Sequence, residues 1–462
     1  MVGKSERWEN GEDKSATALS RVTAFTLDLV PEDIPLPARE MAALLLLDTL
    51  GVCAASAPME AGVLGRETAA MLHAAGNPAM AARMLFDGRP VSIAGAAYAG
   101  ATQIDNLDWH DGYNPTKGHI GVVVVPTLAA LAESRNTLSG AEALAALVIG
   151  YEIAGRAAIS LHASVSDYHT SGAWNALGVA AMAARLRGLT PGQLREALGI
   201  AEYHGPRSQM MREIANPTML HDGSGWGALA GMSAAIQAEL GFTGAPAVTI
   251  EAPEAAIHWE DIGRFWQVEH QYVKPYPTCR WAHAAVDAAR ELCLMHMIDA
   301  VDIETVRIRS FNYAVELFPG MPDTTSKAQY SLPFAVAVML VHRNIGLEHV
   351  SGAGLADRAV AALVARTELI AEPRHEARYP AGRWADVELV MRDGRILASG
   401  DVHARGGPER PYSADDIIAK FMGTAVPLLG QARAAAIRDG CLSLTSPGSR
   451  FGDLAAQLYD PV

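Results

Sequence analysis

The stretch DNLDWHDGYNPTKGHIGVVVVP, residues 105–126, places three aspartates and two histidines directly before an apolar run. Such side chains need partners, because an unpaired charge away from water is costly. A carboxylate such as Asp108 that orients a histidine such as His119 would serve proton transfer near neutral pH. A solvated loop whose aspartates cap the next helix would also explain the pattern. The stretch lacks the HExxH, paired Cys/His and EF-hand spacings of metal motifs, so we expect no metal.

Four further polar stretches interrupt apolar sequence. They are DYHTSG with His169, HDGSG with His221, KPYPTCRWAH with Lys274, Arg280 and His283, and Asn312-Tyr313 at the end of a predicted strand. Each alone would fit a helix cap, a buried histidine or a surface cation. Together they supply the base, proton donor and cations that proton abstraction beside a carboxylate requires. The glycine-rich turn after His221 would also offer free backbone N–H groups to an anion.

Composition narrows the class of protein. The chain has 462 residues, half of them hydrophobic and 19% charged, which favours two domains with a large core. Its formal net charge of −14 argues against a nucleic-acid or anionic-membrane partner. The four cysteines are widely spaced, which predicts free thiols. The N-terminal stretch is polar, so we expect no signal peptide. We therefore expect a cytoplasmic protein.

Hydrophobic periodicity predicts the elements that must position these residues. Apolar residues three and four apart predict helices over 37–56, 60–75, 140–161, 228–240, 331–342, 356–367 and 413–457. Thr190, Pro191 and Gln193 predict a capping box. Alternation predicts a strand over 305–312 and a hairpin over 386–402. The expected fold is mainly α, with an all-helical domain (17–264 plus 411–462), an inserted smaller α+β lid domain (265–410) and a disordered tail (1–16).

Several motifs, in order, resemble the MmgE/PrpD family. They are LDWHDG, GHIGVVVVPTLAALAE, GYEIAGR, YHTSGAWNALGVAAMAARLRGL, LHDGSGWGALAG with GFTG, VKPYPTCRWAHAAVDAA and SKAQYSLPFAVAVML. The family includes 2-methylcitrate dehydratase, cis-aconitate decarboxylase and iminodisuccinate epimerase. The resemblance implies a helical domain completed by the C-terminal tail, with the active site between it and the lid. It also implies a homodimer and neither a metal nor an organic cofactor.

Matching positions with the family implies roles for particular residues. Catalytic roles fall to Asp108, His119, His169, His283 and, more loosely, Tyr313, and a substrate contact falls to Lys274. Apart from this matching, we also expect substrate contacts from Arg280, His221 and Thr218.

The chain also departs from the family pattern. It has DWHDG where DFDDT is common, so His110 replaces an aspartate and Gly112 a threonine. Thr218 stands where relatives carry a lysine, which binds a carboxylate strongly. Arg207 or Arg212 would have to compensate for the loss of this cation.

The leading hypothesis is a cofactor-independent lyase that dehydrates a small di- or tricarboxylate by abstracting a proton next to a carboxylate. His119 or His169 would be the base, oriented by Asp108, and His283 or Tyr313 the acid. The alternatives are an epimerase of the iminodisuccinate type, a decarboxylase, and a catalytically silent carboxylate-binding protein.

Overall fold

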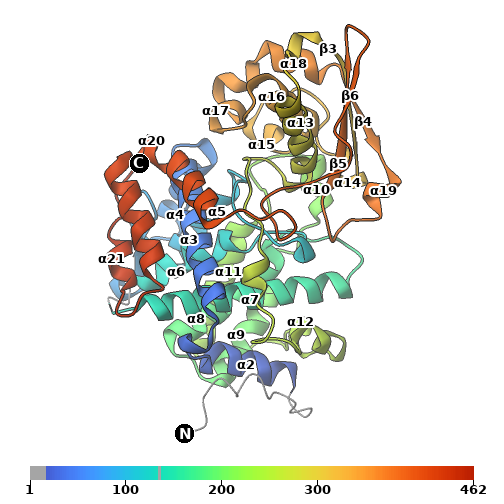
Figure 1. Cartoon of the computed structure of the whole chain (residues 1–462). Coiled ribbons are helices and arrows are strands. Elements are labelled where there is room, and N and C mark those ends of the chain that lie inside the picture. Colours follow the sequence, from blue (N-terminus) through green and yellow to red (C-terminus); the bar gives the residue numbers. More distant parts are fainter. Residues whose placement is uncertain (1–16, 134–136) are drawn as a thin grey trace.

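The computed structural model describes residues 17–133 and 137–462, so the tail expected over 1–16 lies outside the described residues. The structure is mostly α-helical, with about 60% helix and 9% strand. Its buried apolar side chains form two cores. One core lies in a body of helices and the other beneath a small sheet, and Figure 1 shows how these helices and strands are arranged.

The first core lies among helices from both ends of the chain. Its principal helices are α2 (Ala18–Asp28), α3 (Leu36–Ser56), α4 (Glu60–Leu72), α5 (Ile93–Asp105), α6 (Gly121–Ala132), α7 (Gly140–Ser164), α8 (Gly172–Arg187), α9 (Pro191–His204), α11 (Ser224–Glu239), α20 (Ala414–Ser443) and α21 (Phe451–Ala455). The predicted capping box at Thr190 is present at the start of α9. The C-terminal tail rejoins the body as expected, since α20 packs closely along α3.

The contact between α20 and α3 depends on a small residue and on an ion pair. A Cβ on Gly51 would lie 2.8 Å from the ring of Phe421, so only glycine allows this approach. Lys420 of α20 pairs with the buried Asp48 of α3 at 2.7 Å. Asp48 therefore interrupts an apolar helix without being left as an unpaired buried charge.

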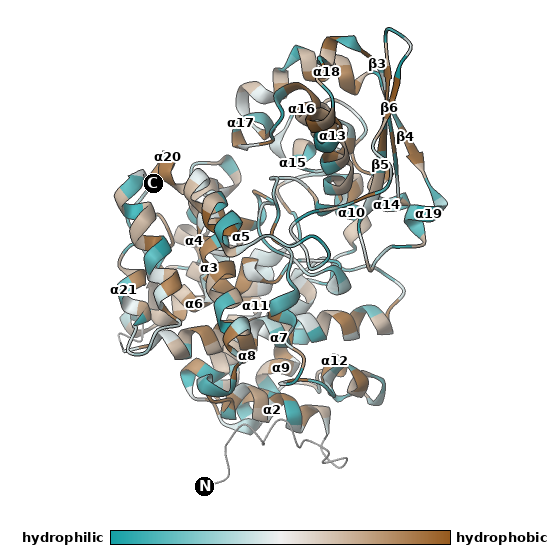
Figure 2. Ribbon diagram, viewed as in Figure 1, coloured by the Kyte–Doolittle hydropathy of each residue, from teal (hydrophilic) through white to brown (hydrophobic). Residues whose placement is uncertain are grey.

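The second core lies beneath a five-stranded sheet. The strands are β3 (Ile303–Ser310), β4 (Thr367–Ala371), β5 (Trp384–Met391), β6 (Ile396–Ala398) and β7 (Val402–His403), and the helices that contribute most are α13 (His283–Met295), α16 (Leu332–His342) and α18 (Arg358–Val364). The order is β4-β3-β5-β6 with β7 beside β5, and only β3 and β4 are parallel. Val387, Leu389 and Met391 of β5 are buried in this core and alternate with less buried residues, which explains the alternating pattern. Figure 2 shows hydrophobic (brown) ribbon along α16, which packs in the same core.

Three details of the predicted fold are wrong. The helical body is not all-helical, because β1 (Ala81–Arg83) pairs with β2 (Pro90–Ser92). The helix expected to reach residue 367 ends at residue 364, and Thr367 begins strand β4. Tyr313 lies in the short helix α14 (Asn312–Val315), beyond the end of β3. These segments have three to five residues, too few for their periodicity to distinguish helix from strand.

The two cores do not divide the chain at one position. Met210 and Ile214 of α10 (Met210–Ala215) pack in the second core, although they precede the predicted boundary at residue 265. The domain limits and the lid therefore stay predictions.

Helix α7 has the length and hydropathy of a membrane span, but 94% of its apolar window is buried inside the structure. That burial is typical of the central helix of a large core.

Candidate active site

The loop that follows α5 is held in an unusual conformation by two lysines. Asp108 has a left-handed φ of 55°, which is uncommon for a residue other than glycine. Lys274 pairs with the Asp108 carboxylate and donates to its carbonyl oxygen at 2.9 Å. Lys420 donates to the carbonyl of Trp109 at 2.8 Å. The expected contact between Asp108 and a histidine is replaced by the Lys274 ion pair, and backbone strain of this kind is concentrated at functional sites.

His119 lies beside this loop with its two ring nitrogens in different settings. Nδ1 is 2.7 Å from the carbonyl oxygen of Asp111, which can only accept, so Nδ1 carries the proton. Nε2 is then an unprotonated acceptor, 3.9 Å from a carboxylate oxygen of Asp222. Burial, followed by the charge of Lys274, holds the pKa of His119 well below its usual range. The ring is therefore neutral at pH 7, and its unprotonated Nε2 is the atom that can accept a proton.

A second histidine supports the first. The ring of His110 lies edge-on to that of His119, with centroids 4.5 Å apart, and its Nε2 is 3.8 Å from Asp105. Burial, then the charges of His119 and Lys274, hold the pKa of His110 well below its usual range.

The N-terminus of α11 already has an acceptor. Gly223 has a left-handed φ of 67°, and the backbone N–H of Ser224 donates to Asp105 at 3.0 Å. The anion-binding turn predicted after His221 therefore holds a carboxylate of the protein itself.

Buried carboxyl groups surround the histidines. Burial raises the pKa of Asp222 to about 6, while a hydrogen bond from Ser171 opposes the rise. Burial and the neighbouring Asp222 raise the pKa of Asp105, and the same two causes raise that of Glu213, which accepts from the Tyr330 hydroxyl at 2.6 Å. The site thus combines neutral imidazoles with buried carboxyl groups whose pKa values are raised.

His221 and His283, two of the predicted site residues, are buried close to this group. His221 has a φ of 42°, faces the Tyr330 ring at 5.4 Å, and has a pKa of about 3 because of burial and Lys274. His283 lies edge-on to Tyr276, with Nε2 3.0 Å from the Thr278 carbonyl. Burial, then Arg280 and Lys274, lower its pKa.

The contacts of the remaining predicted residues lie elsewhere. His169 is half-buried, and its backbone N–H donates to His162 at 3.3 Å. Tyr313 stacks on Trp281 with ring centroids 5.4 Å apart. Thr218 is exposed, and its hydroxyl accepts from the N–H of Leu220. Arg207 and Arg212 are exposed too.

Sequence reasoning missed several residues of the group. They are Ser171, Glu213, Asp222, Tyr272, Tyr330 and Arg383. Ser171 and Asp222 stand next to motif histidines and were within reach of the same reasoning. Arg383 follows a glycine in an unremarkable loop, and no local signal marks it.

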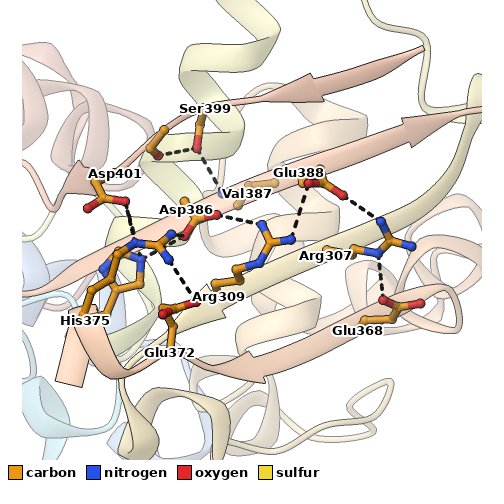
Figure 3. A network of polar contacts seen from close by, with 12 residues as sticks. Arg307, Arg309, Glu368, Glu372, His375, Asp386, Val387, Glu388, Ser399 and Asp401 are labelled. Carbon is orange, nitrogen blue, oxygen red and sulfur yellow. Dashed lines mark hydrogen bonds and ion pairs between the residues drawn. The ribbon is translucent and has the colours of Figure 1, made fainter.

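One further cluster has the spacing of a metal site. Among the described residues, His375, Asp386 and Asp401 have ligand atoms within 4.8 Å of one another. Arginines already surround them, since Arg374 pairs with both aspartates. Arg309 also pairs with Asp386, as Figure 3 shows. Their charge compensates the carboxylates, so we interpret the cluster as a structural network.

Replacing Gly112 is expected to disturb the centre of the site. A Cβ at this position would lie 2.3 Å from the Tyr272 hydroxyl oxygen and 2.8 Å from Nδ1 of His119, so a threonine of the family type has no room. Gly112→Ala should lower the free energy of unfolding by about 1–3 kcal/mol through overpacking. Tyr272→Leu removes both the hydroxyl oxygen and the ring carbon Cζ, which would lie 2.5 Å from that Cβ, so in that background the loss should be smaller. Equal losses in urea denaturation of the two backgrounds would contradict this geometry.

His221 should make stability depend on pH. Its folded pKa is about 3, against an ordinary value of 6.5, so the unfolded chain binds the proton first as the pH falls. The contribution of neutral His221 to the free energy of unfolding is therefore complete above pH 6.5 and is lost as the pH falls toward 3. Between pH 7 and pH 4, the free energy of unfolding of the wild type should fall by about 3 kcal/mol more than that of His221→Asn. Asparagine is chosen because its side chain tolerates positive φ. Parallel denaturation curves at both pH values measure the difference, and identical losses would contradict the assignment.

The fold and the site together define a predominantly α-helical enzyme with a buried acid–base centre. Residues 20–261 match the MmgE/PrpD N-terminal domain, and residues 276–444 match the MmgE/PrpD C-terminal domain. The chain belongs to the MmgE/PrpD family. It is 25% identical to a cis-aconitate decarboxylase of Homo sapiens over 359 residues, 72% of this chain and 73% of that protein. It is 23% identical to a cis-aconitate decarboxylase of Aspergillus terreus over 475 aligned positions, 94% of this chain and 95% of that protein.

Proposed function

We propose that the protein is a lyase that acts without a cofactor on a small di- or tricarboxylate, with His119 as the general base. The observation that carries the proposal is the fixed tautomer of His119. Its Nδ1–H is held by the Asp111 carbonyl, which leaves Nε2 free to accept a proton from the carbon next to a carboxylate. General-base catalysis of this kind contributes about 10²- to 10⁴-fold to the rate.

The charges around His119 suit a carboxylate substrate. Lys274 lies close enough to lower the pKa of His119, and Arg280 contributes in the same direction. A carboxylate bound between these cations would have its neighbouring C–H bond acidified, because the cations stabilise the negative charge that develops as the proton leaves.

Dehydration follows if a protonated carboxyl group then acts as the acid. His119 would take the proton from carbon, the C–O bond would break, and Asp222 or Asp105 would donate a proton to the departing hydroxyl to form water. Burial raises the pKa of both carboxyl groups, which favours the protonated form that this step needs.

Decarboxylation is the second candidate, and the named relatives favour it. In that reaction a C–C bond to a carboxylate breaks, carbon dioxide leaves, and a protonated group of the enzyme donates to the resulting carbanion. The same raised carboxyl pKa values would serve this step. The two reactions differ in whether His119 must first remove a proton.

Access to the site would require the second core to move relative to the helical body. Lys274 is fully buried, whereas the His119 side chain is 13% exposed. Two hollows, of about 580 Å³ beside Trp109 and Lys420 and about 290 Å³ beside Asn106, adjoin the same loop from outside. This loose packing supports a lid that opens, and the homodimer and the cytoplasmic location stay predictions.

The test is turnover of a panel of hydroxy-, unsaturated and amino-polycarboxylates by the purified protein with EDTA present. Loss of a 3-hydroxy acid with appearance of its alkene indicates dehydration, and release of carbon dioxide indicates decarboxylation. Deuterium from solvent entering the α-carbon without net elimination would indicate an epimerase. Activity that EDTA abolishes and added metal restores would overturn the cofactor-free mechanism, and binding without turnover would point to a silent carboxylate-binding protein.

A further inference from the structure

We propose that Arg383, together with Arg280 and Lys117, forms a second anion subsite that holds a carboxylate of the substrate remote from the one beside Lys274. The inference rests on the proposed function and makes it more specific, because it requires a substrate with at least two separated carboxylates. Arg383 and Lys117 carry none of the roles that the family resemblance implies.

Arg383 is a buried cation held in place by backbone carbonyls. Its side chain is among the largest fully buried ones in the structure. Its guanidinium donates to the carbonyl of Pro380 and lies 4.7 Å from the ring centroid of Tyr379. Its Nε is buried without a hydrogen-bond partner.

Arg280 repeats this arrangement on the neighbouring segment. It donates to the carbonyls of Ala404 and Arg405 and lies over the Tyr272 ring, 4.4 Å from its centroid. Its Nε is likewise buried without a partner. Burial, and to a smaller extent the like charge of Arg383, lower the pKa of Arg280 to about 10, while Tyr272, Asp287 and Glu409 oppose the fall.

Neither of these two guanidinium groups forms an ion pair with an acidic side chain among the described residues, and Asp287 and Glu409 act on Arg280 only from farther away. In the part of the chain that the structure describes, every other fully buried arginine or lysine forms an ion pair, such as Lys274 with Asp108 and Arg156 with Glu152. No carboxylate lies within 4.0 Å of Arg280 or Arg383 among those residues. Two buried cations that repel one another are costly, so the arrangement is best explained by an anion that arrives from outside.

The subsite adjoins the acid–base centre and extends toward solvent. Lys117 is half-buried at the end of the turn Asn114–Thr116, which contacts the Arg383 loop, because the side-chain amide of Asn114 donates to the Ala381 carbonyl at 3.4 Å. Burial, then the charge of Arg383, lower the pKa of Lys117. On the other side, the Tyr272 ring under Arg280 is 6.2 Å from the ring of His119. One tyrosine therefore separates the cationic group from the proposed base.

The geometry implies how a substrate would lie. One carboxylate would bind near Lys274 with its neighbouring carbon at His119, and a second would reach past Tyr272 to the arginine pair. Arg280 lies between the two ends, and Arg383 contacts only the far one. Arginine suits this role, because its planar fork binds a carboxylate through two parallel hydrogen bonds. A monocarboxylate cannot occupy both subsites.

The test compares Arg383→Gln with Arg378→Gln by titration calorimetry on the full chain. Arg378 is on the same loop but is 40% exposed and pairs with Asp401, so it serves as a matched control. The probes are tricarballylate, succinate, propionate and inorganic phosphate. We expect Arg383→Gln to weaken tricarballylate binding about ten- to a hundredfold, to leave propionate binding unchanged, and to raise KM more than it lowers kcat. Arg383→Lys should recover part of the loss, which separates the charge from misfolding.

Several results would overturn the subsite. They are unchanged tricarballylate binding in Arg383→Gln, an equal loss in Arg378→Gln, absence of binding by wild type, or phosphate binding that depends on Arg383 and exceeds that of the carboxylates. Wild-type binding that depends on Arg383, in a protein that turns over no member of the substrate panel, would support the subsite and overturn the proposed reaction. Turnover with the same KM and kcat in wild type and Arg383→Gln would overturn the subsite and leave the proposed reaction supported.

Discussion

Replacing His119 by asparagine should lower kcat by about 10²- to 10⁴-fold while leaving the protein folded. Asparagine can still donate from the Nδ position to the Asp111 carbonyl, which accepts the histidine Nδ1–H at 2.7 Å. It has no atom at the position of Nε2, so only the proton acceptor is removed. Steady-state kinetics on whichever polycarboxylate wild type consumes, together with thermal unfolding, provide the measurement.

His258→Asn is the matched control, because His258 is half-exposed in a short helical turn away from the acid–base group. It should retain wild-type kcat. If His119→Asn lost less than threefold in kcat, His119 would not be the base, and the other buried histidines would have to be tested. If it lost its cooperative unfolding transition, the residue would be structural.

The second large effect concerns the buried ion pair between Lys274 and Asp108. Lys274→Met should lower the free energy of unfolding by about 3–5 kcal/mol, because it leaves the Asp108 carboxyl group buried without its counter-charge. Burial already raises the pKa of Asp108, and Lys274 is the charge that opposes the rise. Activity should fall as well, since the same ammonium group lies beside His119.

The double variant Asp108→Asn/Lys274→Met separates the two consequences. Removing both charges should restore most of the stability, because an asparagine at position 108 needs no counter-charge. It should restore none of the activity, because Lys274, which would hold the substrate carboxylate, is still missing. Lys327→Met is the control, since the pair of Lys327 with Asp323 is largely exposed and should cost less than 1 kcal/mol. If the losses in free energy of unfolding of Asp108→Asn and Lys274→Met added up to the loss in the double variant, the two charges would not be coupled.

The helices were predictable because their signals are local. The capping box at Thr190 and the long apolar helices α3 and α7 each depend on residues within a few turns of one another. Strand β4 was missed because its five residues follow a helix directly and pair with β3, about sixty residues earlier in the chain. Pairing over such distances leaves little trace in local periodicity.

The sequence by itself determined the family and the mainly helical class, because several motifs in a fixed order are specific, and it predicted some of the side chains that gather around His119. Only the tertiary structure decided which partner each side chain has. Asp108 was expected to orient a histidine, yet it pairs with Lys274, 166 residues away. Arg383 carries no local signal and acquires its proposed role only from its neighbours. Charge compensation and proton position depend on distances of a few ångströms between segments, and residue spacing along a chain does not specify those distances.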